Sequence, residues 1–396
     1  MKAALLLALM ALLSSTAEAA AAKRPARPKR PARHRVKVEA PRLTDPTAVS
    51  WPRRLKPGRW TPAAADALER LLQHLGEGAT GYSRADPPAA VFVLDDAALS
   101  GSPGDALLAR LTAEAAFSFD ESFWKQLPPH YGAARARAGW QSFQGQPRTV
   151  WARDPHYLMY RKALHAAYAS LCRDAGRKTC ARWRAALLTG LDESALQRMA
   201  RQVVAEALRV PVTPERVGDS PEDPAPTAVT AALRVVPEML DLVRVLQDRG
   251  FDVWVMSASS QYAALEAARL YGVHPTRVVG LRQKVTNGQI TPDILQPVPE
   301  GAGLAEALTL FLGRPPALAV GRLEDGPLLD YGDGSGLSLL LAEPSTAPPE
   351  AARNGWLVQP PFSPVREPQA AVYPPPPGTR PPAEPAPPAP DAAGGP

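Results

Sequence analysis

Short, mostly apolar runs recur along the middle of the chain, and longer amphipathic segments separate them. Apolar runs of four to six residues are typical of strands buried on both faces of a parallel sheet. The runs are 89–94, 251–256, 277–281, 317–320 and 337–341, and the predicted helices are 63–75, 237–249, 261–271 and 302–312. Strands that alternate with helices predict the α/β class, with a Rossmann-like parallel sheet and right-handed crossovers.

One connection departs from this alternation. About 150 residues separate the first run from the second, and their pattern is almost wholly helical, as in 157–171, 180–188 and 193–208. A helical insertion after the first strand predicts a cap over the carboxyl edge of the sheet, where open α/β sheets bind ligands. We therefore expect core segments at 51–99 and 227–342 and a cap insertion at 100–226. Within the core, Asn287 and Gly288 predict the turn of a hairpin.

The first residues predict the compartment. Lys2 precedes an apolar stretch, 3–13, and the small-x-small sequence at 17–19 is typical of a signal peptidase site. Eleven apolar residues are too few for a spanning helix, which needs about twenty. We therefore expect a signal peptide at 1–19 and a periplasmic or secreted mature chain without a transmembrane segment. A retained N-terminal anchor is the alternative.

Two segments have compositions typical of disorder. The basic arm, 20–50, holds eight Lys or Arg residues between 23 and 37, broken by prolines. Removing these eight charges from the net +6 leaves −2 for the rest of the chain, so no nucleic-acid partner is expected. The arm is either a solvated tether or a contact to anionic envelope polymers or lipid headgroups.

The C-terminal part, 343–396, is predicted to be a proline-rich disordered tail. From 374 to 396, eleven of twenty-three residues are proline, which favours a polyproline-type spacer or a docking segment for a protein partner. Residues 344–368 are expected to form a loosely ordered transition, in which Trp356 and Phe362 pack on the folded body.

The chain contains two cysteines, Cys172 and Cys180. An even number in an oxidising compartment predicts a disulfide. This disulfide would close a short loop between two predicted helices and contribute at most about 3 kcal/mol. No histidine or further cysteine completes a metal-ligand set.

Four segments in a fixed order resemble the haloacid dehalogenase superfamily. They are 90–92 leading to Gly101, Gly104 and Asp105; then 253–259; then 279–282; and then 297–303. The resemblance covers about 89–342 and is nearest to exported phosphoserine- or phosphorylcholine-phosphatase-like proteins with a helical cap. It implies a phosphatase fold whose active members use Mg²⁺.

The nucleophile that the resemblance implies is missing. Active members carry Asp-x-Asp-x-Thr after the first strand, where the first carboxylate attacks phosphorus and the second is the general acid/base. Here Val93 takes the nucleophile position, Asp95 keeps the acid/base position and Ala97 replaces the threonine. No two aspartates stand two positions apart anywhere in the chain, so no shift of register restores the motif. Valine has no lone pair, which excludes covalent catalysis by this route.

The remaining motifs are retained only in part. Ser257 matches the serine that donates to the phosphoryl group, and it also suits a helix N-cap. Leu304 stands in place of the phosphate-binding lysine. Arg322 replaces a metal-binding aspartate, and Asp325 is left as a doubtful, vestigial metal position. Mg²⁺ requires hard oxygen ligands, so we expect no cofactor.

Arg322 leaves two hypotheses open. It either forms a cationic pocket with Ser257 that binds phosphate or sulfate without hydrolysis, or it pairs with Asp95 and stabilises an empty cleft. Both predict that Arg322 lies close to Asp95.

Other signals favour ordinary structure. The segment 332–336 predicts a turn, and His130, His156 and His165 are expected to be surface or core residues. Trp140, Trp151 and Tyr157 form either a cage for a quaternary ammonium group or, more simply, the core of the cap.

The sequence thus predicts an exported, catalytically inactive pseudo-phosphatase that acts as a binding or scaffold protein in the cell envelope. Its ligand would be a phosphate-bearing molecule or an envelope polymer. The alternative is an atypical phosphomonoester hydrolase in which Asp95 activates water.

Overall fold

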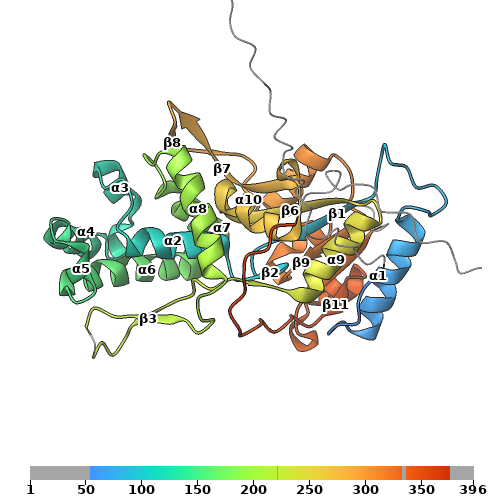
Figure 1. Ribbon diagram of the computed structural model, residues 1–396, viewed down its shortest axis with the longest axis horizontal. Helices are drawn as coiled ribbons and strands as arrows, with labels where there is room; N and C mark the ends of the chain where they lie inside the picture. Colours follow the sequence, from blue (N-terminus) through green and yellow to red (C-terminus); the bar gives the residue numbers. More distant parts are fainter. Residues whose placement is uncertain (1–53, 221, 332–335, 375–396) are drawn as a thin grey trace, which may run out of the picture. The chain divides into compact units, whose positions relative to one another are not determined.

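A seven-stranded sheet is the centre of the computed structural model, which describes residues 54–220, 222–331 and 336–374 (Figure 1). The strand order is β11-β10-β9-β1-β6-β7-β8, and every neighbouring pair is parallel except β7 with β8. The strands are β1 (Ala89–Val93), β6 (Asp252–Ser260), β7 (Val278–Thr286), β8 (Gln289–Leu295), β9 (Leu318–Gly321), β10 (Leu337–Leu341) and β11 (Leu357–Gln359). The predicted signal peptide, the predicted basic arm and residues 375–396 lie outside the described residues, as does most of the predicted turn at 332–336.

The central strand shows why apolar runs predicted this sheet. All five residues of β1 are buried, and Phe92 pairs with Val255 of β6 on one side and with Val320 of β9 on the other. A strand with neighbours on both edges and helices on both faces must be apolar at every position. The predicted strands and the hairpin turned at Asn287-Gly288 are confirmed.

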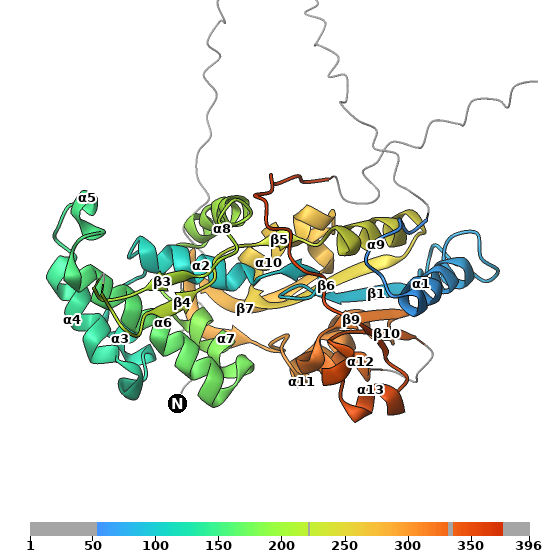
Figure 2. The same cartoon turned by 90° about the horizontal axis from the view of Figure 1, so that it is seen from below.

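Helices cover both faces of the sheet. In Figure 2, α9 and α10 lie on one side and α11, α12 and α13 on the other. The helices of the core are α1 (Pro62–Leu75), α9 (Pro237–Asp248), α10 (Gln261–Ala268), α11 (Ala302–Ala307), α12 (Gly326–Leu329) and α13 (Pro349–Arg353), with a π-helical turn η4 (Leu308–Leu312) and 3₁₀ turns η2 (Arg269–Tyr271), η3 (Pro275–Arg277), η5 (Leu323–Asp325) and η6 (Pro344–Thr346). The start of α1 follows the sequence signals, because Thr61 Oγ1 accepts from the N–H of Ala64 and Pro62 is the first helical residue.

The predicted helical insertion is also confirmed. It comprises η1 (Pro129–Tyr131), α2 (Pro103–Ala113), α3 (Glu121–Gln126), α4 (Ala133–Phe143), α5 (Arg148–Trp151), α6 (Pro155–Ala175), α7 (Arg177–Ala186), α8 (Glu193–Ala207), β3 (Glu215–Val217) and β4 (Thr227–Val229). Two short antiparallel ladders accompany it: β3 pairs with β4, and β2 (Leu99–Ser100) pairs with β5 (Arg234–Val235) at the entry and exit of the insertion. The fold class is therefore α/β, with a Rossmann-like sheet and an inserted helical cap.

The predicted start of the disordered tail at residue 343 is wrong for residues 343–374. This segment forms α13 and then β11, which extends the sheet beyond β10. Trp356 and Phe362 are buried as predicted, and the Phe362 ring meets the edge of Trp60 at 4.9 Å between centroids. The proline-rich composition of the segment predicts disorder, whereas burial of Trp356 and Phe362 favours an ordered segment.

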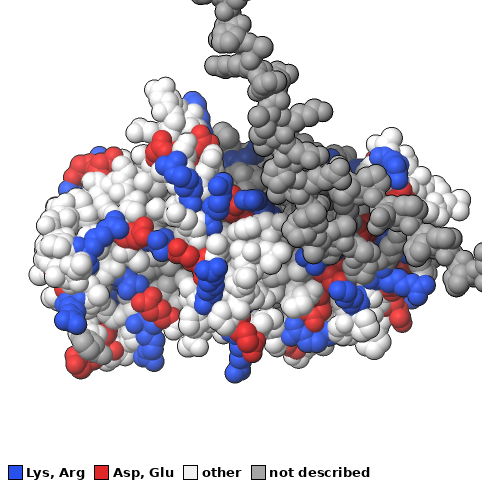
Figure 3. All heavy atoms as spheres, viewed as in Figure 1, with Lys and Arg blue, Asp and Glu red and all other residues white. Residues whose placement is uncertain are grey.

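The described surface has mixed charge. On the face seen in Figure 3, the visible Lys and Arg side chains lie among Asp and Glu side chains. No helix within 54–220, 222–331 or 336–374 combines the length and apolar character needed to cross a membrane.

Candidate functional site

A cavity of about 330 Å³ lies between the carboxyl end of β1 and the cap. Side chains from α2, α6 and α7 and the β4 strand line it on the cap side. The end of β1 and the segment before α11 line it on the sheet side. Its charged lining consists of Asp95, Asp96, Asp105, Glu300, Arg177 and Arg184. The cavity is thus at the edge of the sheet where the topology predicts a ligand.

Asp95 and Ser257 are brought together, as the motifs predicted. Asp95 is 3% exposed, and its two carboxylate oxygens accept hydrogen bonds from different hydroxyls. Ser257 Oγ donates to Oδ2, and Ser259 Oγ donates to Oδ1 at 2.6 Å. Sequence reasoning had assigned no role to Ser259, although its spacing of two from Ser257 puts both side chains on the same face of β6. The carboxylate of Asp95 is held as an acceptor at a fixed position.

The residues at the nucleophile, threonine and lysine positions of the motifs belong to the hydrophobic core. Val93 ends β1 and is 4% exposed, Ala97 is also 4% exposed, and Leu304 in α11 is 1% exposed. Each packs in the same core cluster. No titratable or nucleophilic side chain therefore stands at these three positions.

The hypothesis that Arg322 pairs with Asp95 itself is wrong, because Arg322 pairs with Asp96, the next residue along the chain. Arg322 Nη1 lies 3.5 Å from Asp96 Oδ2, and its Nη2 lies 3.9 Å from Glu324 Oε1. Asp95 is turned toward the two serine hydroxyls of β6. Asp96 has a positive φ of 54° and accepts from the N–H of Gly101. The backbone turn directs the two neighbouring carboxylates to different partners.

Asp325 has a structural partner at the start of η5. Its side chain is 2% exposed and accepts a hydrogen bond of 2.8 Å from the backbone N–H of Arg322. Burial raises the pKa of this carboxyl to about 6. Among the residues that the structure describes, no group of three or more His, Cys, Asp or Glu side chains is placed to hold a metal ion. With Val93 and Arg322 at two of the expected ligand positions, these side chains do not fit Mg²⁺ held in the manner that the sequence resemblance implies.

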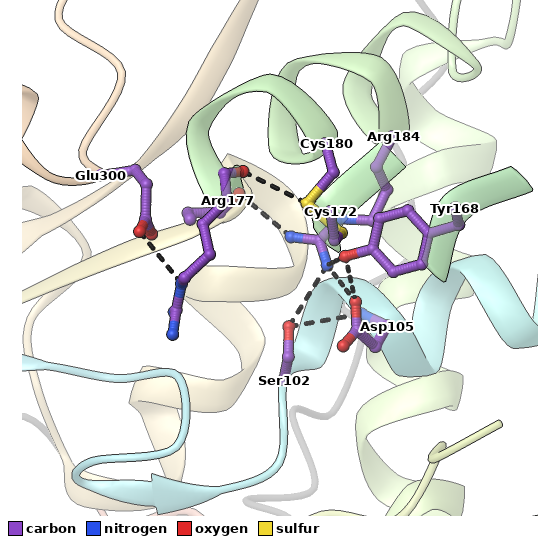
Figure 4. Close-up of a disulfide and its surroundings, with 9 residues drawn as sticks. Ser102, Asp105, Tyr168, Cys172, Arg177, Cys180, Arg184 and Glu300 are labelled. Atoms are coloured by element: carbon purple, nitrogen blue, oxygen red, sulfur yellow. Dashed lines mark hydrogen bonds and ion pairs between the residues drawn. A yellow bond between two sulfur atoms is a disulfide. The ribbon is translucent and has the colours of Figure 1, made fainter. Parts of the chain in front are cut away.

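Arg177, which the sequence did not single out, provides a cation from the cap. It is the first residue of α7, and its Nε lies 3.0 Å from Glu300 Oε1. Its Nη1 lies 3.9 Å from Glu324 Oε2, and the charges of Asp325 and Asp95 also raise its pKa. Figure 4 shows Arg177 extending from the cap to Glu300. A guanidinium from the cap thus stands among carboxylates of the core.

Glu300 is a buried acid on the sheet side of the cavity. It is 5% exposed, and burial raises its pKa to about 7, although the charge of Arg177 acts in the opposite direction. Its segment is tightly constrained at Gly303, because a β-carbon there would lie 1.8 Å from the carbonyl oxygen of Val298. The Gly-x-Gly of the sequence therefore fixes a close backbone turn, whichever residue follows it.

The predicted disulfide between Cys172 and Cys180 is confirmed, and both residues line the cavity. It joins the last turn of α6 to the first turn of α7, across Gly176. Arg177 lies inside the loop that it closes. The disulfide thus restrains the segment that carries the cation (Figure 4).

Arg184 connects the cap to the core. It is 7% exposed and pairs with Asp105 of α2, while its Nη2 donates to the carbonyl oxygen of Ala258 in β6 at 3.1 Å. Tyr168 Oη donates to the same Asp105 carboxylate at 2.7 Å. The charge of Arg184 is therefore compensated within the wall of the cavity.

Of the three histidines singled out in the cap, only His165 lines the cavity. It is 5% exposed, its Nε2 has no hydrogen-bond partner, and burial lowers its pKa to about 3. His165 is therefore neutral at physiological pH.

Of the two alternatives for Trp140, Trp151 and Tyr157, the structure supports the core of the cap and not the quaternary-ammonium cage. Trp140 stacks on Phe119 at 4.7 Å between centroids, and Trp151 packs edge-on against Phe143 at 5.0 Å. Tyr157 donates to a main-chain carbonyl of α2. These rings form the core of the cap and do not line the cavity.

Comparisons with known proteins give a fold and no activity. No protein-family model matches the chain, and no curated protein matches it. The chain is similar to a conserved protein of unknown function from Anaerococcus prevotii, with 18% identity, 79% of this chain and 99% of the other covered, and a TM-score of 0.66. At that identity the likeness shows a shared fold alone.

Two solved hydrolases are matched more remotely. A HAD-family hydrolase from Salmonella enterica serovar Typhi is 13% identical, with 65% of each chain covered and a TM-score of 0.34. A probable phosphoserine phosphatase from Vibrio cholerae is 11% identical, with 68% of this chain and 60% of the other covered and a TM-score of 0.32. Neither likeness is strong enough to carry an argument about this chain.

Proposed function

We propose that this chain is a catalytically inactive member of the haloacid dehalogenase-like phosphatases, exported from the cytoplasm, that binds a ligand in the cavity beneath its cap. The observation that carries the proposal is the state of Asp95. Both of its oxygens accept from serine hydroxyls, while the position two residues earlier is the buried Val93. The only carboxylate kept from the first motif is held by two hydroxyls and has no nucleophile at the neighbouring motif position.

The electrostatics support the same conclusion. A phosphoryl dianion needs preorganised cations or donors at its oxygens. Here Leu304 is apolar, and the nearest guanidiniums are engaged with carboxylates: Arg177 with Glu300, Arg184 with Asp105 and Arg322 with Asp96. The cavity nevertheless stays open at about 330 Å³, a size suited to a small molecule. A retained cavity whose guanidiniums are paired with carboxylates, and which lacks the motif's nucleophile and lysine, favours binding over hydrolysis.

A second candidate function is an atypical phosphomonoester hydrolase in which Asp95 activates water. It is favoured by the place of Asp95 in the cavity lining. A general base must accept a proton from water within hydrogen-bond reach. Asp95 is 3% exposed, so only a small part of its carboxylate can be reached by a water molecule, although each oxygen can accept a second hydrogen bond beside its serine hydroxyl.

Hydrolysis of p-nitrophenyl phosphate by the purified mature chain separates the two functions. We expect no turnover above that of the Asp95→Asn variant, with or without Mg²⁺. Turnover that requires Mg²⁺ and disappears in Asp95→Asn would establish the hydrolase and refute the inactive assignment. Glu306→Gln, which removes an exposed carboxylate from α11, is the matched control for the change of charge.

Export is a separate part of the proposal. It rests on the sequence of residues 1–19, and the disulfide between Cys172 and Cys180 is in keeping with an oxidising compartment. We further propose that the basic arm contacts anionic envelope polymers and that the proline-rich end contacts a protein partner. N-terminal sequencing of the chain from a periplasmic or culture fraction tests cleavage after residue 19. Recovery of an uncleaved chain from the cytoplasm would refute export.

A further inference from the structure

The cavity beneath the cap has an excess of negative charge. Four carboxylates line it, from Asp95, Asp96, Asp105 and Glu300, against two guanidiniums, from Arg177 and Arg184. Arg184 and Asp105 neutralise each other in the wall, and Arg322, which is not itself part of the lining, pairs with Asp96. Asp95 accepts from two hydroxyls and forms no ion pair of its own, although its charge also acts on Arg177 and Arg184. The charge of Asp95, together with the Glu300 carboxylate at the border of the cavity, therefore disfavours a phosphate or carboxylate ligand and favours a cation.

The rest of the lining is apolar. Leu108 of α2, Ala169 of α6, Ala181 of α7 and Val229 of β4 contribute to the wall, together with the disulfide. His165 adds a buried, neutral ring whose Nε2 has no hydrogen-bond partner. The combination suits a ligand with a charged head and a short hydrocarbon body, because apolar walls favour the body and the carboxylates favour the head.

Arg177 shows how a cation is accommodated here. Its guanidinium lies 3.0 Å from Glu300 and 3.9 Å from Glu324. Its side chain is 34% exposed, so it is held by these ion pairs at the border of the cavity and is not buried in a core. A second cation that approaches Glu300 from the cavity would compete with Arg177 for the same carboxylate.

We propose that the cavity binds a small organic cation, a primary ammonium group on a short apolar chain, with the ammonium at Glu300 and Asp95 and the chain against the cap. This inference rests on the proposed binding function of the cavity and specifies its ligand class. An ammonium group has three N–H donors, and the carboxylate oxygens of Glu300 and Asp95 can accept them. At present Arg177 is the cation that binds Glu300. The ligand is opposite in charge to the phosphoester that the fold resemblance suggests.

The protonation of Glu300 should make amine binding depend on pH. The groups that act on it are Arg177 of α7, Asp325 and Glu324 of η5, and Asp95 after β1. Burial raises its pKa to about 7, so a proton and an ammonium group compete for the same carboxylate near neutral pH. Amine affinity should therefore fall as the pH is lowered from 8 to 5.

The test uses four probes of equal chain length: pentylamine, pentan-1-ol, pentanoate and pentyl phosphate. Binding to the mature chain is measured by isothermal titration calorimetry at pH 8 in a buffer without primary amines. We expect pentylamine to bind and the other three probes to show no measurable binding. Binding of pentanoate or pentyl phosphate in preference to pentylamine would overturn the cation inference and leave a binding function in place. Absence of binding by all four would overturn the inference as well.

Two substitutions that should change pentylamine affinity in opposite directions complete the test. Glu300→Gln removes the proposed acceptor and should weaken pentylamine binding roughly tenfold, the value of one charge-assisted hydrogen bond. Arg177→Gln removes the competing cation and should strengthen it. Glu306→Gln, exposed on α11, should change neither. If Glu300→Gln and Arg177→Gln alter stability but leave pentylamine affinity unchanged, their pair is structural and the inference is wrong. The phosphatase assay is independent, since turnover would refute the inactive assignment without affecting these affinities.

Discussion

The guanidinium of Arg184 lies directly against Gly104, where a β-carbon would come within 2.3 Å of Cζ. Gly104 is in the first turn of α2, and its N–H donates to Ser259 Oγ at 2.8 Å. Arg184 comes from α7 and reaches past Gly104 to the carbonyl of Ala258. The absence of a side chain at 104 is therefore what allows the cap to attach to the sheet at this point.

Gly104→Ala should displace Arg184 and destabilise the fold. The arginine is 7% exposed and already held by Asp105 and Ala258, so it has little freedom to move aside. Overpacking of this kind costs about 1–3 kcal/mol, measured as a fall in the free energy of unfolding in urea. Gly145→Ala is the control, because a β-carbon there meets nothing within 4 Å. Equal effects of the two changes would contradict the close contact.

Asp95→Asn should also destabilise the chain. The amide would replace an acceptor of two hydroxyl hydrogen bonds with a group that can accept at only one of its two terminal atoms. The expected loss is roughly 1–3 kcal/mol in the free energy of unfolding. Residues kept for catalysis often limit stability, so their replacement tends to stabilise. A gain of stability in Asp95→Asn would therefore favour the hydrolase in which Asp95 activates water.

The pH dependence of stability should reveal Glu300. Its pKa is raised from 4.5 to about 7 in the folded chain, so the folded state binds this proton more tightly than the unfolded state. The contribution of Glu300 to the free energy of unfolding therefore falls as pH rises between these values. Relative to the wild type, Glu300→Gln should gain about 2 kcal/mol between pH 5 and pH 8. Urea unfolding at both pH values, with Glu306→Gln as control, measures this gain, and a constant difference would show that the pKa of Glu300 is not raised.

Loss of the disulfide should lower stability moderately. The bridge from Cys172 to Cys180 spans a sequence separation of 8, and closing so short a loop is worth about 2–3 kcal/mol. Thermal unfolding of Cys172→Ser/Cys180→Ser, compared with the oxidised wild type, measures it. The reduced wild type should behave like the double variant. Unchanged unfolding after reduction would mean that the helix packing alone holds the loop.

Truncation tests the corrected boundary of the C-terminal part. A chain that ends at residue 374 should unfold like the full chain, whereas one that ends at 342 loses β11 and the buried Trp356 and Phe362. Burial of one large side chain is worth about 1.5–3 kcal/mol, so the shorter chain should be destabilised by several kcal/mol. Equal stability of the two chains would restore the original assignment of 343–374 to a dispensable tail.

The sequence was informative where local pattern determines structure. The apolar run 89–94, the turn at Asn287-Gly288 and the pairing of Cys172 with Cys180 all depend on neighbours a few residues away. The cavity was predicted only in part. Asp95 and Ser257 were found through their motif, whereas Arg177 and Glu300 come from distant segments that carry no signal of their own.

Two details depend on side-chain direction, which residue order does not specify. The sequence places Arg322 near Asp95, but the positive φ of Asp96 decides which of the two adjacent carboxylates it pairs with. The sequence also leaves open whether Trp140 forms a cage or the core of the cap, and its packing on Phe119 supports the core.

Gln359 of β11 brings the two ends of the folded part together. Its Oε1 accepts from the backbone N–H of Thr61, a residue 298 positions earlier, and its Nε2 donates to the carbonyl of Arg59. The edge of the sheet next to β10 is therefore completed by a strand that also holds the start of α1 in place. Contacts between residues so far apart in sequence slow folding, because a long loop must close before they can form. Docking of β11 should consequently be a late step of folding, and until then β10 presents an unpaired edge that favours aggregation.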